Sequence, residues 1–265
     1  MRHRPRTLTI PVTLCAWALF LSVASTCDAQ ESGAGDPSTR ATVSEASETE
    51  GTTKGKTDKP KTPWRSLKKH WVACEFGGEG DASVKDGVVT LEYGDPLTGV
   101  RWDGPFEGDK EPTKKKDVAP LPRDNYELRW ECVRDDGFDF LCAFTFPVDQ
   151  ANASLVMGGW GGGITGISSI DGQDASDNQT TMFKAFENDQ WYKARVRVEK
   201  AKITVWLDGT LMFEQPRADH KFDIRFEMDP CTPLGIANFE CDSRIKNIQV
   251  RKLHPSELAE VETEE

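Results

Sequence analysis

Apolar and polar residues alternate with a period of two through most of the chain between residues 64 and 253. In residues 125–133 every second side chain is apolar, and mostly glutamate and arginine stand between them. Residues 192–198 and 203–207 repeat the pattern, and Asp208-Gly209 follows as a strong hairpin turn. Such alternation is typical of β-strands with one buried face, so we predict a meander of strands here.

Aromatic side chains dominate the next candidate strand, residues 138–146. At every second position stand Phe138, Phe140, Cys142, Phe144 and Phe146. A row of this kind predicts a strand whose aromatic face lies in the core. Asp139 would then lie on the opposite face, where a ligand could reach it.

About a dozen short strands with frequent turns are expected between residues 64 and 253, and helical periodicity is almost absent. The closing strands are expected at 224–227, 234–239 and 245–253. This pattern predicts an all-β domain built as a two-sheet sandwich rather than a parallel α/β sheet.

The first 29 residues have the features of a secretory signal peptide. Arg2, Arg4 and Arg6 precede an apolar stretch at 14–24, and Cys27-Asp28-Ala29 is an acceptable cleavage site. The apolar stretch is too short to span a bilayer as a helix. We expect export to the periplasm or the extracellular space; lipid anchoring at Cys27 is disfavoured because Thr26 is too large for a lipoprotein signal.

Two further segments lack the composition of a packed core. Residues 30–63 contain no aromatic side chain and are rich in Ser, Thr, Gly, Glu and Lys, which predicts a disordered tether. Residues 254–265 form an acidic tail, expected to be loose. The predicted organisation is therefore signal peptide 1–29, tether 30–63, β-sandwich 64–253 and tail 254–265.

Charge and missing motifs exclude several classes of function. The formal net charge of −11 disfavours binding of nucleic acid or anionic membranes, and no second apolar run long enough to span a bilayer follows the signal peptide. The sequence has no C-x-x-C, H-E-x-x-H or G-x-S-x-G motif, so zinc peptidases and serine esterases are disfavoured. No motif indicates an organic cofactor.

Five cysteines follow the signal peptide, and an exported protein meets conditions in which neighbouring thiols tend to pair. Cys132 and Cys142 lie on a predicted hairpin, and Cys231 and Cys241 flank a short segment. Each pair is a disulfide candidate that would leave Cys74 free. Buried free thiols are the alternative.

The candidate ligand-binding residues begin with a glycine-rich stretch, 158–166, that surrounds Trp160. Glycine allows close backbone approach, so this stretch could be a bulged strand that lines a cleft with Trp160 as a stacking surface, or a purely structural bulge. Residues 161–166 match G-x-G-x-x-G, but no helix is expected after them, which rejects a dinucleotide site. Trp206 is expected on the outward side of its strand, either as a sugar platform or as an edge-packing residue. The other two candidates are Asp174 and Asn178.

Carboxylates supply the remaining candidates. Asp171, Asp174 and Asp177 place oxygen ligands in one loop, as calcium would need, but a solvated acidic loop with Asx turns is the favoured alternative. Glycoside cleavage needs two carboxylates across a sugar site, and Asp139, Asp171 and Glu187 are the candidate catalytic residues. Glu187-Asn188-Asp189 and Glu227-Met228-Asp229 each lack the third acid of the E-x-D-x-E pattern of jelly-roll glucanases.

Five segments, taken in order, resemble one family. They are residues 84–91, 125–128, 190–193, 203–209 and 245–253. They are similar to the exported bacterial 3-keto-disaccharide hydrolase domain, of the concanavalin-like lectin/glucanase group. The resemblance implies a jelly-roll sandwich that acts on sugars at its concave face.

The chain departs from that family where typical members carry an Asn-Ser-Gly segment and a Glu-x-Gln pair. Here stand Phe138-Asp139-Phe140-Leu141 and the stretch around Trp160, so no catalytic residue is carried over. Two functional hypotheses follow: a hydrolase of 3-keto-disaccharide-type glycosides, and a non-catalytic carbohydrate-binding or envelope-associated module. A structural interaction domain without a sugar ligand is a third.

Overall fold

A computed structural model describes residues 61–110 and 117–259 of the chain. The signal peptide, Cys27 and nearly all of the tether lie outside the described residues. In the described part, no helix is long and apolar enough to cross a membrane.

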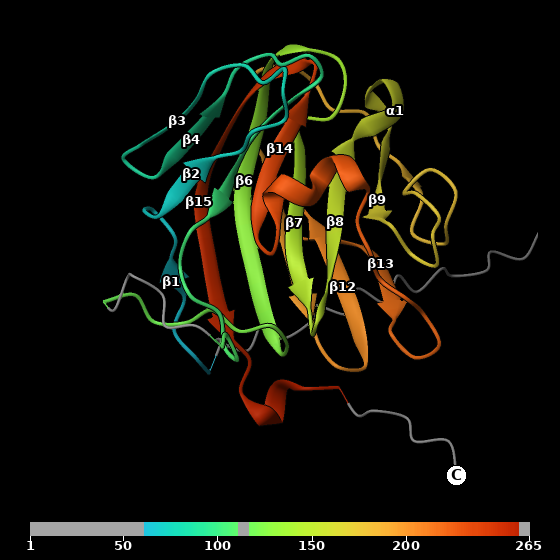
Figure 1. The fold of residues 1–265 in the computed structure, drawn as a ribbon. Coiled ribbons are helices and arrows are strands. Elements are labelled where there is room, and N and C mark those ends of the chain that lie inside the picture. Colours follow the sequence, from blue (N-terminus) through green and yellow to red (C-terminus); the bar gives the residue numbers. More distant parts are fainter. Residues whose placement is uncertain (1–60, 111–116, 260–265) are drawn as a thin grey trace, which may run out of the picture. The chain divides into compact units, whose positions relative to one another are not determined.

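Two antiparallel sheets pack face to face (Figure 1). The first sheet has, in spatial order, β13 (Thr210–Pro216), β12 (Lys202–Leu207), β11 (Tyr192–Val198), β6 (Tyr126–Gly137), β15 (Cys241–Lys252), β4 (Val88–Leu91) and β3 (Ala82–Lys85), with β1 (Arg65–Ser66) also paired to β15. The second has β10 (Met182–Phe183), β9 (Ile164–Ser168), β8 (Ala151–Gly158), β7 (Cys142–Val148), β14 (Gly235–Phe239), β5 (Leu97–Trp102) and β2 (Trp71–Ala73). The expected all-β, two-sheet jelly-roll sandwich is confirmed.

The main core lies between the sheets and follows the alternation read from the sequence. Tyr126, Leu128 and Trp130 of β6 are each 1% exposed and face the second sheet, where Phe144 packs against Trp130 with 4.3 Å between ring centroids. The predicted hairpin of β11 and β12 is present, and β13 continues it after Asp208-Gly209.

A smaller apolar cluster covers the outer face of the second sheet. It comprises Cys74, Leu97, Ala143, Val156, Ala175, Met228, Cys231 and Ala237. The short 3-10 helix η1 (Phe226–Cys231) contributes two of these residues and crosses in front of β14 and β7 in Figure 1. Because both faces of this sheet are covered, every residue of β7 is buried.

Three local predictions were wrong. Phe138 is 62% exposed and Phe140 joins the outer cluster, because the strand begins only at Cys142. The glycine-rich stretch forms a tight turn, α1 (Gly159–Gly162), with positive φ at Trp160, Gly161 and Gly162, rather than a bulged strand. Residues 224–227 run into η1, not a strand. The side chain of Asp139 accepts hydrogen bonds from the backbone of Phe140 and Gly161, and these bonds favour a turn over a strand at 138–140.

The start of the acidic tail is ordered, contrary to expectation. Residues 255–257 form a second 3-10 helix, η2 (Pro255–Glu257), whose first turn is capped by His254. Glu257 accepts hydrogen bonds from Arg251 at 3.0 Å, which fastens η2 to the end of β15. The tail therefore begins as part of the domain.

The five cysteines of the described domain are free thiols, so the predicted disulfides are absent. Cys231 lies beside Cys74, with 3.8 Å between their sulfurs, and not beside Cys241. Cys241 instead donates to the carbonyl of Phe140. The proposed Cys231–Cys241 pair fails because η1 places Cys231 over the outer face of the second sheet, whereas Cys241 begins a strand of the first sheet.

Native Cys241 is expected to resist alkylation. Burial raises the pKa of Cys241 to about 12, so the nucleophilic thiolate is scarce at pH 8. Iodoacetamide at pH 8 should modify it at least about tenfold more slowly in the native protein than in urea, as read by peptide mass spectrometry. Equal rates in both states would contradict the buried position.

Candidate functional site

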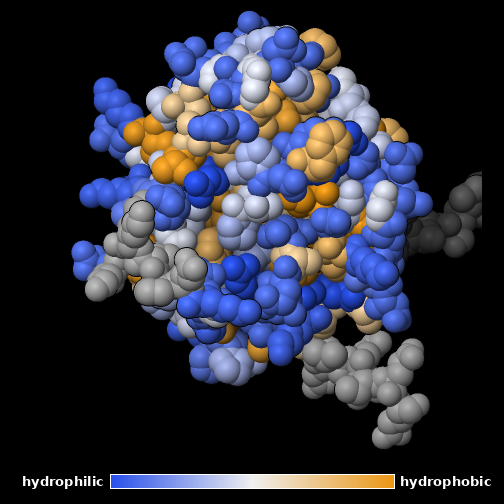
Figure 2. Space-filling model, in the orientation of Figure 1, coloured by the Kyte–Doolittle hydropathy of each residue, from blue (hydrophilic) through white to orange (hydrophobic). Residues whose placement is uncertain are grey.

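A pocket of about 300 Å³ opens on the outer face of the second sheet. Its lining residues are Pro96, Leu97, Asp139, Phe140, Ala143, Ser154, Val156, Trp160, Ser168, Arg225, Glu227, Met228 and Phe239. The floor comes from the outward side chains of β7, β8 and β9, and the walls come from η1, α1 and the turn before β7. Figure 2 shows apolar residues between hydrophilic ones on the face of the molecule turned toward the viewer in Figure 1.

The wall of the pocket at α1 is formed by Trp160, whose side chain is 41% exposed. Trp160 has a positive φ of 52°, which a non-glycine residue adopts rarely. The turn is held by Asp139, which accepts a hydrogen bond from the Gly161 amide at 2.8 Å. An exposed indole with a strained backbone therefore lies at the pocket, and such strain is commonest at functional positions.

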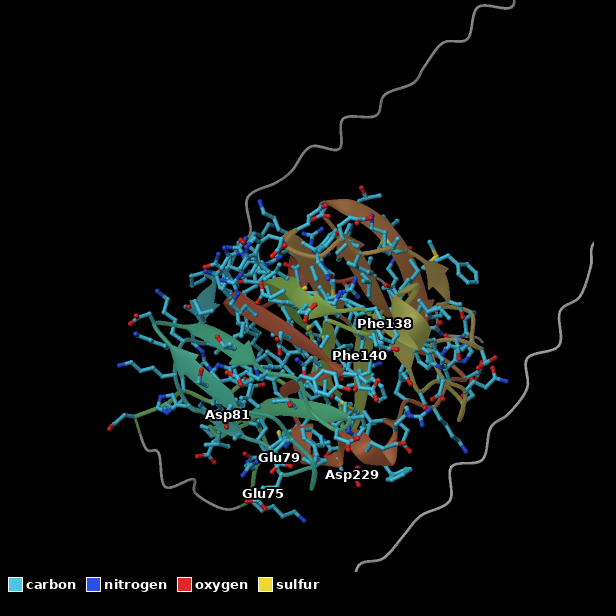
Figure 3. The ribbon with its side chains drawn as sticks, turned by 90° about the horizontal axis from the view of Figure 1, so that it is seen from above. Glu75, Glu79, Asp81, Phe138, Phe140 and Asp229 are labelled. Carbon is cyan, nitrogen blue, oxygen red and sulfur yellow. The ribbon has the colours of Figure 1, made fainter. Side chains whose placement is uncertain are left out.

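Asp139 belongs to the turn between β6 and β7, which is anchored from below by Arg134. The Arg134 guanidinium donates to the carbonyls of Phe138 at 2.9 Å and Asp139 at 2.8 Å. Figure 3 shows Phe138 and Phe140 close together at this end of the sandwich, with Glu75, Glu79 and Asp229 farther to one side. The turn thus directs Asp139 and Phe140 to the pocket.

Ion pairs centred on Arg225 form another wall of the pocket. Arg225 contacts the carboxylate of Asp174 and donates to Glu227 at 2.9 Å, and Ser168 donates to Asp174 at 3.1 Å. The hydrogen bond from Arg225 lowers the pKa of Glu227, so this carboxylate is ionised at neutral pH. The pocket therefore combines an aromatic ring, apolar walls and a fixed set of polar groups.

Comparison with known proteins places this chain in a family. The sequence model described as the 3-keto-alpha-glucoside-1,2-lyase-like domain matches residues 49–251. The chain belongs to this family. Its membership confirms the predicted family and, at the coarse level, a carbohydrate-active domain.

Solved structures that the chain resembles include the carbohydrate-binding module CBM66 from Bacillus subtilis, at 9% identity and a TM-score of 0.45, covering 72% of this chain and 100% of that chain. Another is domain 4 of AbnA, an extracellular arabinanase from Geobacillus stearothermophilus, at 17% identity and a TM-score of 0.40, covering 73% of this chain and 85% of that one. Among curated proteins no match is found.

In this member of the 3-keto-alpha-glucoside-1,2-lyase-like family, the surroundings of several carboxyl groups favour the ionised form. Among the described residues, the acids with a clearly shifted pKa are Glu79, Asp171, Glu227 and Glu257, and each pKa is lowered. A general acid for glycoside cleavage instead needs a raised pKa. Glu227 therefore suits ligand binding or proton acceptance better than proton donation.

The structure brings together only part of the predicted site. Asp139 and Trp160 line one pocket, and Asp174 reaches it through Arg225. Asp171 lies elsewhere, paired with His220 at 2.7 Å, and the amide of Lys221 is the largest cause of its lowered pKa. Glu187 does not line the pocket either. The three candidate catalytic residues therefore do not share a site.

Two other candidate ligand-binding residues have structural contacts instead. Asn178 is 8% exposed; its amide donates to the carbonyls of Ile167 and Asp174, and its oxygen accepts from the backbone of Thr180. These bonds fix the loop after β9. Trp206 lies on the outer face of the first sheet, beneath Arg195.

The acidic loop does not assemble a three-carboxylate site. Asp171 is bound to His220, Asp174 to Arg225, and Asp177 to the hydroxyl of Ser176. Within residues 61–110 and 117–259, no group of three or more His, Cys, Asp or Glu side chains could hold a metal ion. Calcium binding stays a prediction without a formed site.

Sequence reasoning missed Arg225 and Glu227 as a pair and did not single out Arg134. Both residues stand in Arg225-Phe226-Glu227, a segment for which the sequence predicts a strand. Arg225 instead caps the start of η1 and Glu227 lies in its first turn, and both line the pocket.

Proposed function

We propose that this pocket binds a sugar unit and that the chain acts as an exported carbohydrate-binding domain. The observation that carries the proposal is the exposed indole of Trp160 in one pocket with Asp139 and the Arg225–Glu227 pair. Sugar pockets combine an aromatic surface for the C–H face of the ring with a few fixed polar groups for its hydroxyls.

The polar groups retain capacity for a ligand. Asp139 accepts one backbone hydrogen bond on each carboxylate oxygen, and each oxygen has a second lone pair. Arg225 donates one hydrogen bond to each carboxylate oxygen of Glu227, and each oxygen has a second lone pair. Hydroxyl donors of a sugar could bind both acids without breaking the existing bonds.

Trp160→Ala is expected to weaken glycan binding about thirtyfold, because truncation of a central aromatic residue commonly costs about 2 kcal/mol or more. The measurement is calorimetric titration of the full-length protein against ligands found in a glycan panel that includes 3-keto-glycosides. The matched control is Phe183→Ala, since Phe183 is 85% exposed and does not line the pocket. Equal losses in both variants would refute the role of the pocket.

Cleavage of a 3-keto-disaccharide-type glycoside is the second candidate function, because Asp139 and Glu227 line the same pocket. Glu227, with its lowered pKa, would act as base or nucleophile, and Asp139 would have to deliver the proton to the leaving oxygen. Turnover that is abolished in Glu227→Gln and Asp139→Asn, with binding retained, would make the domain an enzyme. If the unaltered protein binds the glycan without turning it over, the domain is a carbohydrate-binding module rather than an enzyme.

A further inference from the structure

A second concave surface lies on the other sheet. A groove of about 470 Å³ follows the outer face of β6, β11 and β12. We call it the basic groove, and its polar lining residues are Arg129, Glu131, Lys193, Arg195, Asn247 and Gln249. It shares no lining residue with the pocket on the second sheet.

Strand register places two arginines directly opposite each other in this groove. Arg195 of β11 pairs with Arg129 of β6, and on its other side with Trp206 of β12. The Arg195 guanidinium lies 3.7 Å from the centroid of the Trp206 ring. Like charges at directly opposed positions destabilise a sheet unless an anion separates them.

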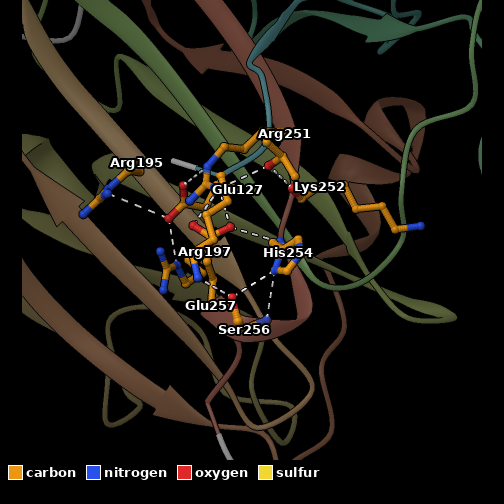
Figure 4. A network of polar contacts seen from close by, with 10 residues as sticks. Glu127, Arg195, Arg197, Arg251, Lys252, His254, Ser256 and Glu257 are labelled. Atoms are coloured by element: carbon orange, nitrogen blue, oxygen red, sulfur yellow. Dashed lines mark hydrogen bonds and ion pairs between the residues drawn. The ribbon is translucent and has the colours of Figure 1, made fainter. Parts of the chain in front are cut away.

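The acids nearby are already engaged by other cations. Glu127 accepts from Arg197 at 2.7 Å and Arg251 at 2.6 Å, while Arg195 remains 3.8 Å away (Figure 4). Glu131, which lines the groove directly opposite Lys193, contacts Lys246 at 3.7 Å and accepts from Asn247, so one carboxylate faces the three cations Arg129, Lys193 and Arg195. The acids therefore leave a positive surplus in the groove.

The three cations of the groove have weak or neutral partners. Arg129 donates to the amide oxygen of Gln249 at 2.7 Å and lies over Trp64. In the part of the chain that the structure describes, neither Arg129 nor Lys193 forms an ion pair within 4.0 Å. Burial lowers the pKa of Arg195; the carboxylate of Glu127 opposes this shift, and the charges of Arg197, Arg251 and Arg129 add to it.

We propose that the basic groove binds an acidic glycan, with Arg195 and Arg129 holding its carboxylate or sulfate group. The forked guanidinium suits either group, because both present two oxygens in a plane. The side-chain nitrogen of Gln249 and the side-chain oxygen of Asn247 take no part in the contacts above, and these two atoms can bind sugar hydroxyls.

An acidic glycan fits the groove better than nucleic acid does. The formal net charge of −11 repels a long polyanion with closely spaced phosphates, whereas the surplus of the groove is local. The Trp206 ring is covered by Arg195, so it orients the guanidinium rather than offering a face for base stacking. The occupant is thus recognised by single, spaced anionic groups.

The test measures binding of the full-length protein to polygalacturonate, a sparsely sulfated dextran, unmodified dextran and a DNA duplex at low and moderate salt. Arg129→Gln/Arg195→Gln should weaken binding of at least one acidic glycan about tenfold or more, since each charged hydrogen bond is worth about that factor. Arg195→Lys should weaken carboxylate binding more than sulfate binding if the fork holds a carboxylate in two bonds.

Lys69→Gln/Lys85→Gln is the matched control, because it removes two exposed charges away from the groove. Thermal unfolding should show no loss of stability in Arg129→Gln/Arg195→Gln, since that variant relieves like-charge repulsion. The proposal is overturned if neither acidic glycan binds, if the control loses as much affinity, or if DNA binds more tightly than both glycans. Trp160→Ala should leave this binding intact, so failure here is distinct from failure of the pocket.

Discussion

Glu127→Gln is expected to lower the free energy of unfolding by about 3–5 kcal/mol, since breaking a buried ion pair leaves an uncompensated buried charge. Glu127 is 1% exposed, and each carboxylate oxygen accepts from a different arginine. Arg251, one of the two, has a side chain that is only 3% exposed (Figure 4). Glutamine keeps the shape but turns an N–H group toward one guanidinium.

Urea denaturation followed by tryptophan fluorescence gives the measurement. The matched control is Glu131→Gln on the same strand, whose side chain is 24% exposed and 3.7 Å from Lys246. That change should cost no more than about 1 kcal/mol, as is usual for exposed pairs. Equal effects of the two glutamine variants would contradict this account.

The first sheet could be predicted from the sequence because one of its faces is buried and the other is not. Alternation located β6, β11 and β12 and assigned Leu128, Trp130 and Val196 correctly to the core. The same alternation assigned Glu127 to solvent, and there it fails. The arginines of β11 and β15 cover this carboxylate, and a pattern along one strand does not reveal what a neighbouring strand places over it.

The second sheet was harder to predict because both of its faces are covered. Its strands read as nearly continuous apolar runs, so periodicity no longer marks where a strand starts. We therefore extended β7 back to Phe138, although Asp139 turns the chain there by binding two backbone amides. A side chain that caps a turn rather than facing outward cannot be recognised from alternation alone.

The candidate site was predictable where local chemistry carried the signal. An indole among glycines pointed to Trp160, and an acid among phenylalanines pointed to Asp139, and both line the pocket. The pairing of Arg225 with Glu227 depends on η1, which has no strong sequence pattern. Asp171 was misplaced because spacing in a loop says little about direction, and its partner His220 is 49 residues away.

Arg134→Ala is expected to reduce both stability and glycan affinity, although Arg134 does not line the pocket. Its guanidinium is buried, at 6% exposure, and donates to Phe138, Asp139, Phe186 and Asn188. Removal leaves the buried carbonyl of Phe186 and three partly buried acceptors without this donor. Because an unsatisfied buried acceptor costs about 1–3 kcal/mol and a partly buried one less, we expect a loss of about 3 kcal/mol in all. The turn that carries Asp139 would then lose its anchor.

The turn α1 connects the removal of the Arg134 side chain to the expected loss of glycan affinity. Asp139 holds the Gly161 amide, and that bond sets the backbone of Trp160, so a mobile turn frees the indole from its binding position. Affinity for the ligand of the pocket should fall about tenfold or more at a temperature where the variant is still folded, since misplaced groups lose most of their contact energy. Arg134→Lys retains the charge and one or two of the bonds, so it should fall between the alanine variant and the unaltered protein. If Arg134→Ala unfolds more easily yet binds glycan with unchanged affinity below its unfolding transition, the turn is held without Arg134 and the link from the buried guanidinium to Trp160 is wrong.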